Sequence, residues 1–222
     1  MNDSRIYDIS PLISSRLGVF PGDTPFRREI AMDFEKGDHL LLSSIQSTLH
    51  IGAHADGPNH YVASGSAIHE RPLKMYMGRC LVLHSHAPKG VRIQKGHLSE
   101  KWRLTHGWPA TRILVSTKSF PDPEKWNSDF SSFDPELIEE WAKAGVRLIG
   151  IDTPSIDPED AKELLSHKMV AQYDLAVLEG LVLDHVPEGL YTLIALPLKI
   201  EGADAAPVRA VLVDGPDRLE VL

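Results

Sequence analysis

The amino-acid sequence predicts a mixed α and β fold, rich in strands and built as a single domain over residues 1–222. Short apolar runs with the alternation or the β-branched composition of strands outnumber the segments with helical periodicity. A length of 222 residues suits one large domain with a substantial core. No internal repeat, low-complexity tract or linker divides the chain.

Strands are expected wherever an apolar or alternating run is bounded by turn residues. In chain order, these runs are residues 6–10, 40–49, 80–86, 111–117, 146–152, 175–179, 191–198 and 208–213. The segments 18–25 and 118–133 are rich in turn-forming residues and are expected to be loops, the second long enough to shape the entrance of a site. Residues 202–207 are expected to form a turn of small residues that contains one acid.

The clearest helix is predicted over residues 134–144. Asp134 is a suitable N-cap, Pro135 suits the first helical position, and Gly145 is typical of the position after a helix. The same start pattern recurs at Asp157 and Pro158, and it predicts a short helix through residue 165.

The charge and composition exclude several classes of protein. With 42% hydrophobic and 24% charged residues the composition is that of a globular protein, and the net charge of −8 is unlike that of a general nucleic-acid binder or of a protein attracted to anionic membranes. No segment approaches the roughly 20 apolar residues of a membrane span, and residues 1–10 do not resemble a signal peptide. We therefore expect a cytoplasmic protein with no nucleic-acid or membrane partner.

Cys80 is the single cysteine, which excludes an internal disulfide, and it is expected to be a buried, inert thiol.

One short stretch, residues 50–60, concentrates chemically active side chains. It contains His50, His54, Asp56 and His60, so three imidazoles and one carboxylate fall within eleven positions. Zinc and similar divalent cations prefer this mixture of nitrogen and oxygen ligands. The stretch therefore predicts a metal site, and the alternative is a polar loop that happens to be rich in histidine.

A helical arrangement of this cluster is disfavoured. Gly52, Gly57 and Pro58 lie within it, and glycine and proline are poor residues for a helix interior. The H-E-x-x-H pattern of helical zinc proteases is also absent. We expect a strand end running into a tight loop, with Asp56 and His60 converging on the ion from beyond the turn.

Three residues outside the cluster have two interpretations each. Phe20 either anchors its loop in the core or forms an aromatic wall for a flat substrate, and Trp126 either packs its loop or contacts a ligand. Glu179 ends an apolar strand, and a buried carboxylate needs a partner, which a metal would supply. His167 is unremarkable when considered alone.

The spacing H-x-G-x-H-x-D-x-P-x-H over residues 50–60 resembles the signature of the cyclase-like family of metal hydrolases, and most closely its bacterial kynurenine formamidase (arylformamidase) branch. Further segments that resemble the family occur in the family's order and extend the match over nearly the whole chain. They are residues 7–10, 20–25, 150–155, 179–181, 196–199 and 202–209.

The resemblance implies a site for two divalent metal ions, zinc in the first place and manganese as the alternative. His50, His54 and Asp56 would hold one ion, and Asp56 would also reach the second. His167 would bind the second ion, and Glu179 would bridge the pair. The family further implies a swivelling β/β/α fold that assembles as a homodimer or a larger homo-oligomer.

The resemblance also implies the reaction, which is hydrolysis of N-formyl-L-kynurenine to L-kynurenine and formate in tryptophan degradation. His60 would be the acid/base residue. Phe20 would contact the substrate at a position where the formamidase branch commonly carries Trp. Two alternatives remain at this stage: hydrolysis of another aryl amide or of a cyclic amide such as an isatin-like ring, and a non-catalytic metal-binding module.

Overall fold

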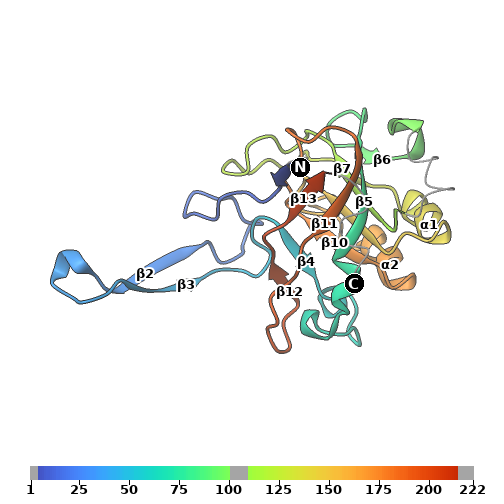
Figure 1. Cartoon of the computed structure of the whole chain (residues 1–222). Coiled ribbons are helices and arrows are strands. Elements are labelled where there is room, and N and C mark those ends of the chain that lie inside the picture. Colours follow the sequence, from blue (N-terminus) through green and yellow to red (C-terminus); the bar gives the residue numbers. More distant parts are fainter. Residues whose placement is uncertain (1–4, 101–109, 215–222) are drawn as a thin grey trace.

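A large curled sheet forms the body of the protein, which we describe from a computed structural model over residues 5–100 and 110–214 (Figure 1). Its strands are β1 (Ile6–Asp8), β4 (His54–Asp56), β5 (Met77–His84), β7 (Arg112–Ser116), β9 (Leu148–Ile151), β10 (Ala176–Glu179), β11 (Gly189–Ile194), β12 (Ala205–Pro207) and β13 (Val211–Asp214). Within the described residues they pair in the spatial order β1-β13-β11-β5-β7-β9-β10-β4-β12. The central strands β5, β7, β9 and β10 run parallel, and the outer pairs are antiparallel.

The remaining elements are short. The smaller strand pairs are β2 (Arg27–Met32) with β3 (Leu42–Gln46), and β6 (Arg92–Ile93) with β8 (Ser132–Phe133). The α-helices of the described residues are α1 (Pro135–Lys143) and α2 (Leu165–Gln172), and the 3-10 turns are η1 (Phe34–Lys36), η2 (Pro58–His60), η3 (Ile68–Glu70), η4 (Leu73–Met75) and η5 (Lys95–His97). Across the described ranges, no helix has both the length and the apolar character needed to cross a bilayer.

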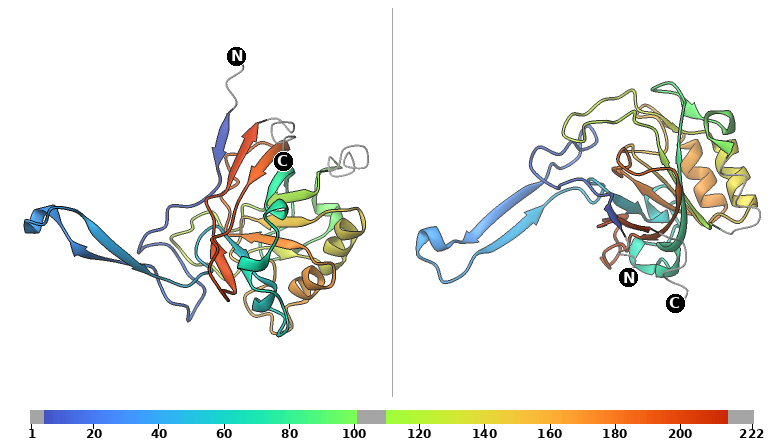
Figure 2. Two further views of the ribbon diagram at one scale, coloured as in Figure 1. Left: turned by 60° about the horizontal axis from the view of Figure 1, so that its bottom comes forward. Right: turned by 45° about the horizontal axis from the view of Figure 1, so that its top comes forward.

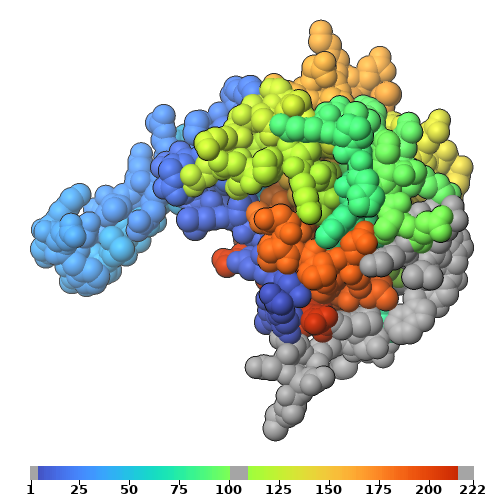
Figure 3. All heavy atoms as spheres, turned by 90° about the horizontal axis from the view of Figure 1, so that it is seen from above, coloured from blue at the N-terminus to red at the C-terminus, as the bar shows by residue number. Residues whose placement is uncertain are grey.

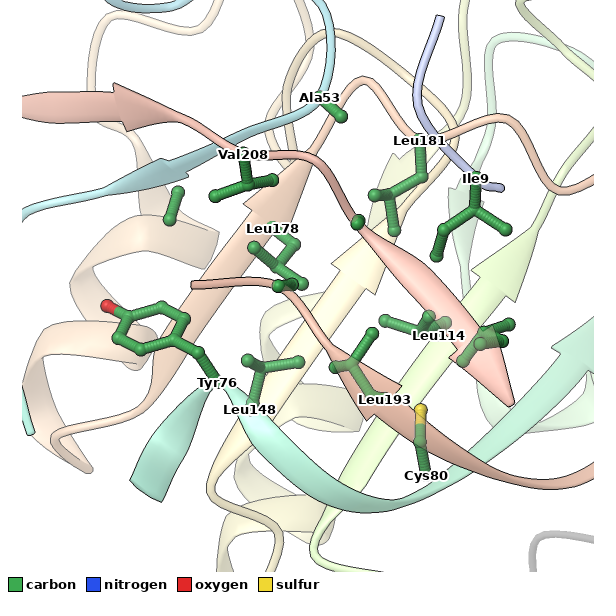
Figure 4. Packing of buried hydrophobic residues seen from close by; sticks show 14 of the residues in the cluster. Ile9, Ala53, Tyr76, Cys80, Leu114, Leu148, Leu178, Leu181, Leu193 and Val208 are labelled. Carbon is green, nitrogen blue, oxygen red and sulfur yellow. The ribbon is translucent and has the colours of Figure 1, made fainter. Parts of the chain in front are cut away.

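The middle of the sheet is buried on both faces. In β7, Leu114 points into a core enclosed by the curl of the sheet, whereas Ile113 and Val115 point into a second core. Figure 4 shows the first core, where Leu114 lies among side chains of other strands of the sheet, such as Leu178 of β10 and Leu193 of β11. Strands buried on both faces read as continuous apolar runs, which is why these segments were recognisable in the sequence.

The helices α1 and α2 cover the second face of the sheet. Leu137, Ile138 and Trp141 of α1 pack into the second core. Asp134 caps α1 as predicted, since its side chain accepts a hydrogen bond from the Glu136 backbone N–H. The predicted helix at 134–144, the mixed α and β class and the predominance of strands are thus confirmed.

The short helix predicted from Asp157 through residue 165 is wrong. Residues 157–164 form turns, and α2 begins at Leu165, where the predicted helix was to end. The Asp157 carboxylate does act as a cap, but across several residues, because it accepts from the backbone N–H groups of Ser166 and His167. Leu164 has a φ of 47°, which interrupts the right-handed helix before α2.

The turn predicted at residues 202–207 is only partly correct. Its second half is the strand β12, which pairs with β4 at the edge of the sheet. Ala205 and Ala206 are fully buried there. Small residues fit this position because they allow β12 to lie close to the neighbouring strand and core, a tertiary requirement that composition alone does not reveal.

Residues 24–47 form a long hairpin that leaves the body, here called the hairpin arm. It contains β2 and β3. The ribbon views and the space-filling view agree that it projects away from the rest of the chain (Figures 1, 2 and 3). None of its residues is buried. The strand predicted at 40–49 therefore exists as the shorter β3, but it belongs to the arm and not to the main sheet.

Candidate metal centre and its pocket

The edge of the sheet brings together residues that are far apart in the sequence. Strand β4 lies between β10 and β12, and in this register His54 faces Glu179 while Asp56 faces Ala205. A strand end that runs into the 3-10 turn η2 then carries the chain to His60, as the glycines and proline predict. The register of three strands therefore assembles residues from positions 54, 56, 179 and 204 at one place.

The predicted ligands converge. His50 Nδ1 lies 3.1 Å from Asp56 Oδ1. His54 Nε2 lies 3.5 Å from Asp56 Oδ1 and 3.4 Å from Glu179 Oε2. His167 Nε2 lies 3.5 Å both from Asp56 Oδ2 and from Glu179 Oε1. The two carboxylates thus occupy the centre, and three imidazole rings each direct one nitrogen at them.

These atoms fit a metal site because they lack other partners. Both carboxylate oxygens of Asp56, His54 Nε2 and His167 Nε2 are buried and make no hydrogen bond within the described parts of the chain. Leaving buried polar atoms unsatisfied costs free energy, and two neighbouring buried carboxylates repel each other. The ligand atoms of His54, Asp56 and Glu179 lie within 4.8 Å of one another, close enough to share one cation.

The other ring nitrogen of each of these three histidines contacts an oxygen atom outside the cluster. His54 Nδ1 is 2.9 Å from the Gly52 carbonyl oxygen, which accepts its proton. His167 Nδ1 is 2.8 Å from Asp157 Oδ2, and His50 Nε2 is 3.1 Å from Asp204 Oδ2. Such outer contacts fix the tautomer and the orientation of a metal-binding histidine. The three rings are therefore aimed at the centre before any cation arrives.

The protonation states of the carboxylates also suit a cation site. Burial by itself raises the pKa of Asp56, but the close imidazole groups of His167 and His50 outweigh this effect and lower that pKa well below its usual value. Burial and the charge of Asp56 raise the pKa of Glu179, and contacts with His167 and His54 again lower it overall. Both groups are ionised at neutral pH and can act as oxygen ligands.

His60 lies at the edge of the cluster, where it is partly exposed. Its ring centroid is 4.1 Å from that of His50, and its Nδ1 is 3.7 Å from Asp204 Oδ2. Its ligand atom also falls within 4.8 Å of those of His50 and Asp56. Burial lowers its pKa, so the ring is neutral at neutral pH. From this position His60 can either accept a proton or bind a cation.

A pocket of about 450 Å³ opens above the cluster, with His50, His54, His60, His167 and Glu179 in its lining. Part of its wall is aromatic and comes from the two loops expected at 18–25 and 118–133. Phe20, Phe120 and Trp126 line this wall, and the Trp126 ring packs edge-on against both phenylalanines at centroid distances of 5.3 and 5.7 Å. Phe20 and Trp126 therefore pack against each other and also line the pocket, and a contact of either ring with a substrate stays a prediction.

Two residues of this site are not recognisable from the sequence. The sequence around Asp157 is typical of a helix start, and Asp204 is an acid in a turn of small residues. In the folded protein, the carboxylate of Asp157 contacts the His167 ring and that of Asp204 contacts the His50 ring. No local pattern identifies such contacts, because each joins residues whose proximity depends on the folded sheet.

The Cyclase family model matches residues 7–158. The kynurenine formamidase of Bordetella avium is 46% identical over 208 residues, which cover 94% of this chain and 97% of that protein.

Solved structures show the same fold. A predicted metal-dependent hydrolase from Bacillus stearothermophilus is 26% identical, with a TM-score of 0.77 over 96% of this chain and 99% of that one. Isatin hydrolase A from Labrenzia aggregata is 21% identical, with a TM-score of 0.77 over 95% of this chain and 93% of that one, a similarity of fold. Because the family model matches most of the chain and this relative matches nearly all of it, the chain belongs to the Cyclase family, within which its relatives include kynurenine formamidases.

Proposed function

We propose that this protein is an arylformamidase that hydrolyses N-formyl-L-kynurenine to L-kynurenine and formate. The observation that carries the proposal is a cluster of buried ligand atoms without a hydrogen-bond partner among the described residues, next to a pocket with an aromatic wall. A relative that is 46% identical over 94% of the chain and named kynurenine formamidase supports the same reaction.

The proposed cofactors are two divalent cations, with zinc favoured over manganese by the number of imidazole ligands. His50, His54 and Asp56 would hold the first, and His167 the second, with Asp56 and Glu179 shared between them. When bound, such cations supply Lewis-acid activation of water and of an amide carbonyl. The five side chains would hold the cations next to the pocket, which a small substrate can enter.

His60 is the proposed acid/base residue. It is neutral at neutral pH and stands at the pocket side of the cluster, so it can accept a proton from the attacking water. It can then return that proton to the nitrogen of the departing aniline, which leaves as a neutral amine. Asp204, 3.7 Å from His60 Nδ1, would stabilise the imidazolium between these two transfers.

The aromatic wall would position the substrate. N-formylkynurenine carries an aryl ring next to its formamide, and offset or edge-on contacts with aromatic side chains bind such a ring favourably. Phe20 lines the same pocket as His60 and would contact the aryl ring of the substrate. A phenylalanine provides this apolar face without a hydrogen-bond donor.

The decisive experiment measures formate release from N-formyl-L-kynurenine by the purified protein. Chelation should abolish turnover, and addition of zinc or manganese to the chelated protein should restore it, with metal content measured in each sample. Cyclic amides such as isatin, tested in parallel, separate this function from the related hydrolase. Bound metal with no turnover of any of these substrates would instead indicate a non-catalytic metal-binding module.

The proposal includes a homodimer or a larger assembly of the same chain, and a small molecule as the only other partner. Its support is the hairpin arm, which presents an uncovered surface of residues 24–47. A cytoplasmic location and the single-domain organisation stay predictions from the sequence.

A further inference from the structure

Glu159 is a carboxylate of the pocket lining that the candidate metal centre does not use. It lies in the turns between β9 and α2, is partly exposed, and belongs to the pocket of about 450 Å³. Its Oε2 accepts a hydrogen bond from the Trp126 indole N–H at 2.8 Å, so the aromatic wall orients the carboxylate. Among the described residues, its other oxygen has no hydrogen-bond partner and the side chain forms no ion pair. One oxygen of Glu159 is therefore available to a group that enters the pocket.

The pocket is acidic away from the metal cluster. None of the described residues that line it is a lysine or an arginine. Two basic side chains of the neighbouring loops are already paired, since Arg16 contacts Glu124 at 2.9 Å and Lys125 contacts Asp122 at 3.0 Å. Glu159 has no such partner in the described parts of the chain. A ligand that brings a positive charge next to Glu159 therefore supplies the missing partner.

N-formyl-L-kynurenine carries such a charge. At neutral pH its α-amino group is an ammonium ion, and this group lies at the opposite end of the molecule from the formamide. An ammonium group donates charge-assisted hydrogen bonds to a carboxylate and is attracted to the faces of aromatic rings. Glu159 and Trp126 provide both kinds of group side by side in the pocket wall. By contrast, the described lining offers the α-carboxylate of the substrate no lysine or arginine.

We propose that Glu159 is a specificity-determining residue that binds the α-ammonium group of the substrate while the formamide lies at the metal centre. This inference rests on the proposed function, and it adds that the preferred substrates are aryl formamides with an ammonium group on their side chain. The ammonium group takes no part in the bond cleavage, so its contact with Glu159 is the same in the bound substrate and in the transition state. Loss of this contact should therefore raise KM and leave kcat nearly unchanged.

Asp23 is another acid of the pocket lining, but it is less suited to this role. Its side chain is exposed, and its Oδ2 already accepts a hydrogen bond from the Thr48 hydroxyl at 3.2 Å. Water and salt screen an exposed charge more strongly than a partly buried one. Glu159, which is less exposed and lies beside Trp126, is the better site for an ammonium group. Asp23→Asn is therefore the comparison that separates the two positions.

The test compares N-formyl-L-kynurenine with formanilide, an aryl formamide without either charged group, on the zinc-loaded protein. Glu159→Gln removes the charge but keeps an oxygen that can accept the Trp126 indole proton, so the pocket wall is retained. We expect KM for N-formyl-L-kynurenine to rise about tenfold and KM for formanilide to stay the same. Asp160→Asn removes the same charge at an exposed neighbour outside the pocket lining, and it should change neither constant.

Two analogues of the substrate identify which of its charges is recognised. The decarboxy analogue keeps the ammonium group, so Glu159→Gln should raise its KM as much as that of N-formyl-L-kynurenine. The deamino analogue keeps only the carboxylate, and Glu159→Gln should leave its KM unchanged or lower it. An equal rise in KM for all four substrates would show that Glu159 only shapes the pocket. Loss of the preference for the ammonium group in Asp23→Asn alone would assign the role to Asp23, and either result overturns the proposal.

Calorimetric binding of L-kynurenine makes the test independent of turnover. This product carries the same ammonium group, so the unaltered protein should bind it more tightly than its deamino analogue, and Glu159→Gln should remove most of that difference. If no formate is released but the difference is present, the proposed function fails and the assignment of Glu159 stands. If formate is released and the variant binds both ligands as the unaltered protein does, the assignment fails and the proposed function stands.

Discussion

Asp157 Oδ2 lies 2.8 Å from His167 Nδ1, and both side chains are buried. Asp157 is itself held by the Arg92 guanidinium at 2.9 Å and by backbone N–H groups at the start of α2. This chain of contacts turns the other nitrogen of His167 towards Asp56 and Glu179. The orientation of one candidate ligand is therefore set by a residue that does not reach the centre.

The first prediction concerns this pair. Asp157→Asn keeps the shape of the side chain but loses the carboxylate that accepts the His167 proton, so the tautomer of the ring is no longer fixed. We expect the affinity for zinc to fall about 10–100-fold. Competition with a chromophoric chelator measures it directly. Asp160→Asn, an exposed change in the same segment, is the control and should have no effect; equal zinc affinity in all three proteins would remove Asp157 from this role.

The second prediction concerns pH. Burial lowers the pKa of His50, but contacts with Asp56 and Asp204 outweigh this effect and raise the pKa to about 9. A proton must leave the ring before it binds a cation. The zinc affinity should therefore rise with pH between about 6.5, the ordinary value for histidine, and about 9. Calorimetric titration in two buffers of different ionisation enthalpy should also detect proton release; an affinity independent of pH would contradict the prediction.

The third prediction assigns His60. If it moves protons and does not bind the cation, His60→Ala should lower kcat by about 10²–10⁴-fold while the metal content stays the same. Loss of a cation from the variant would instead make His60 a ligand, a role its distance from His50 and Asp56 also permits. His86→Ala, at an exposed position outside the pocket lining, controls for general effects of losing an imidazole.

The fourth prediction concerns the backbone beside Glu179. Gly180 has a φ of +64°, and a Cβ there would collide with the carbonyl oxygen of Gly52. Gly145 has a φ of +96° but open space around it, so Gly145→Ala measures the conformational penalty alone, about 1 kcal/mol. Gly180→Ala adds the collision and should reduce the free energy of unfolding by about 3 kcal/mol. Urea denaturation of both variants gives these values, and equal losses would show that the close approach costs nothing.

Local features of the sequence were sufficient for the regular elements of the core. The run at 111–117 is β7 and the capped segment at 134–144 is α1, because a strand buried on both faces and a helix with its own caps carry their signals within a few residues. The helix predicted at 157–165 is wrong, and it shows where local patterns are insufficient. Asp157 and Pro158 form a valid helix start locally, but the carboxylate of Asp157 is used by α2 and His167.

The types and spacing of the candidate ligands can be recognised in the chain alone, since His50, His54, Asp56 and His60 predict a cation site and the wider resemblance adds His167 and Glu179. The groups that support these residues become clear in the folded protein. Asp204 reaches His50 because β12 pairs with β4, and the hairpin arm leaves the body because its strands pair only with each other within the described residues. The physical reason is the same in each case: ligand types are properties of single residues, whereas strand neighbours and carboxylate partners depend on contacts between segments far apart in the chain.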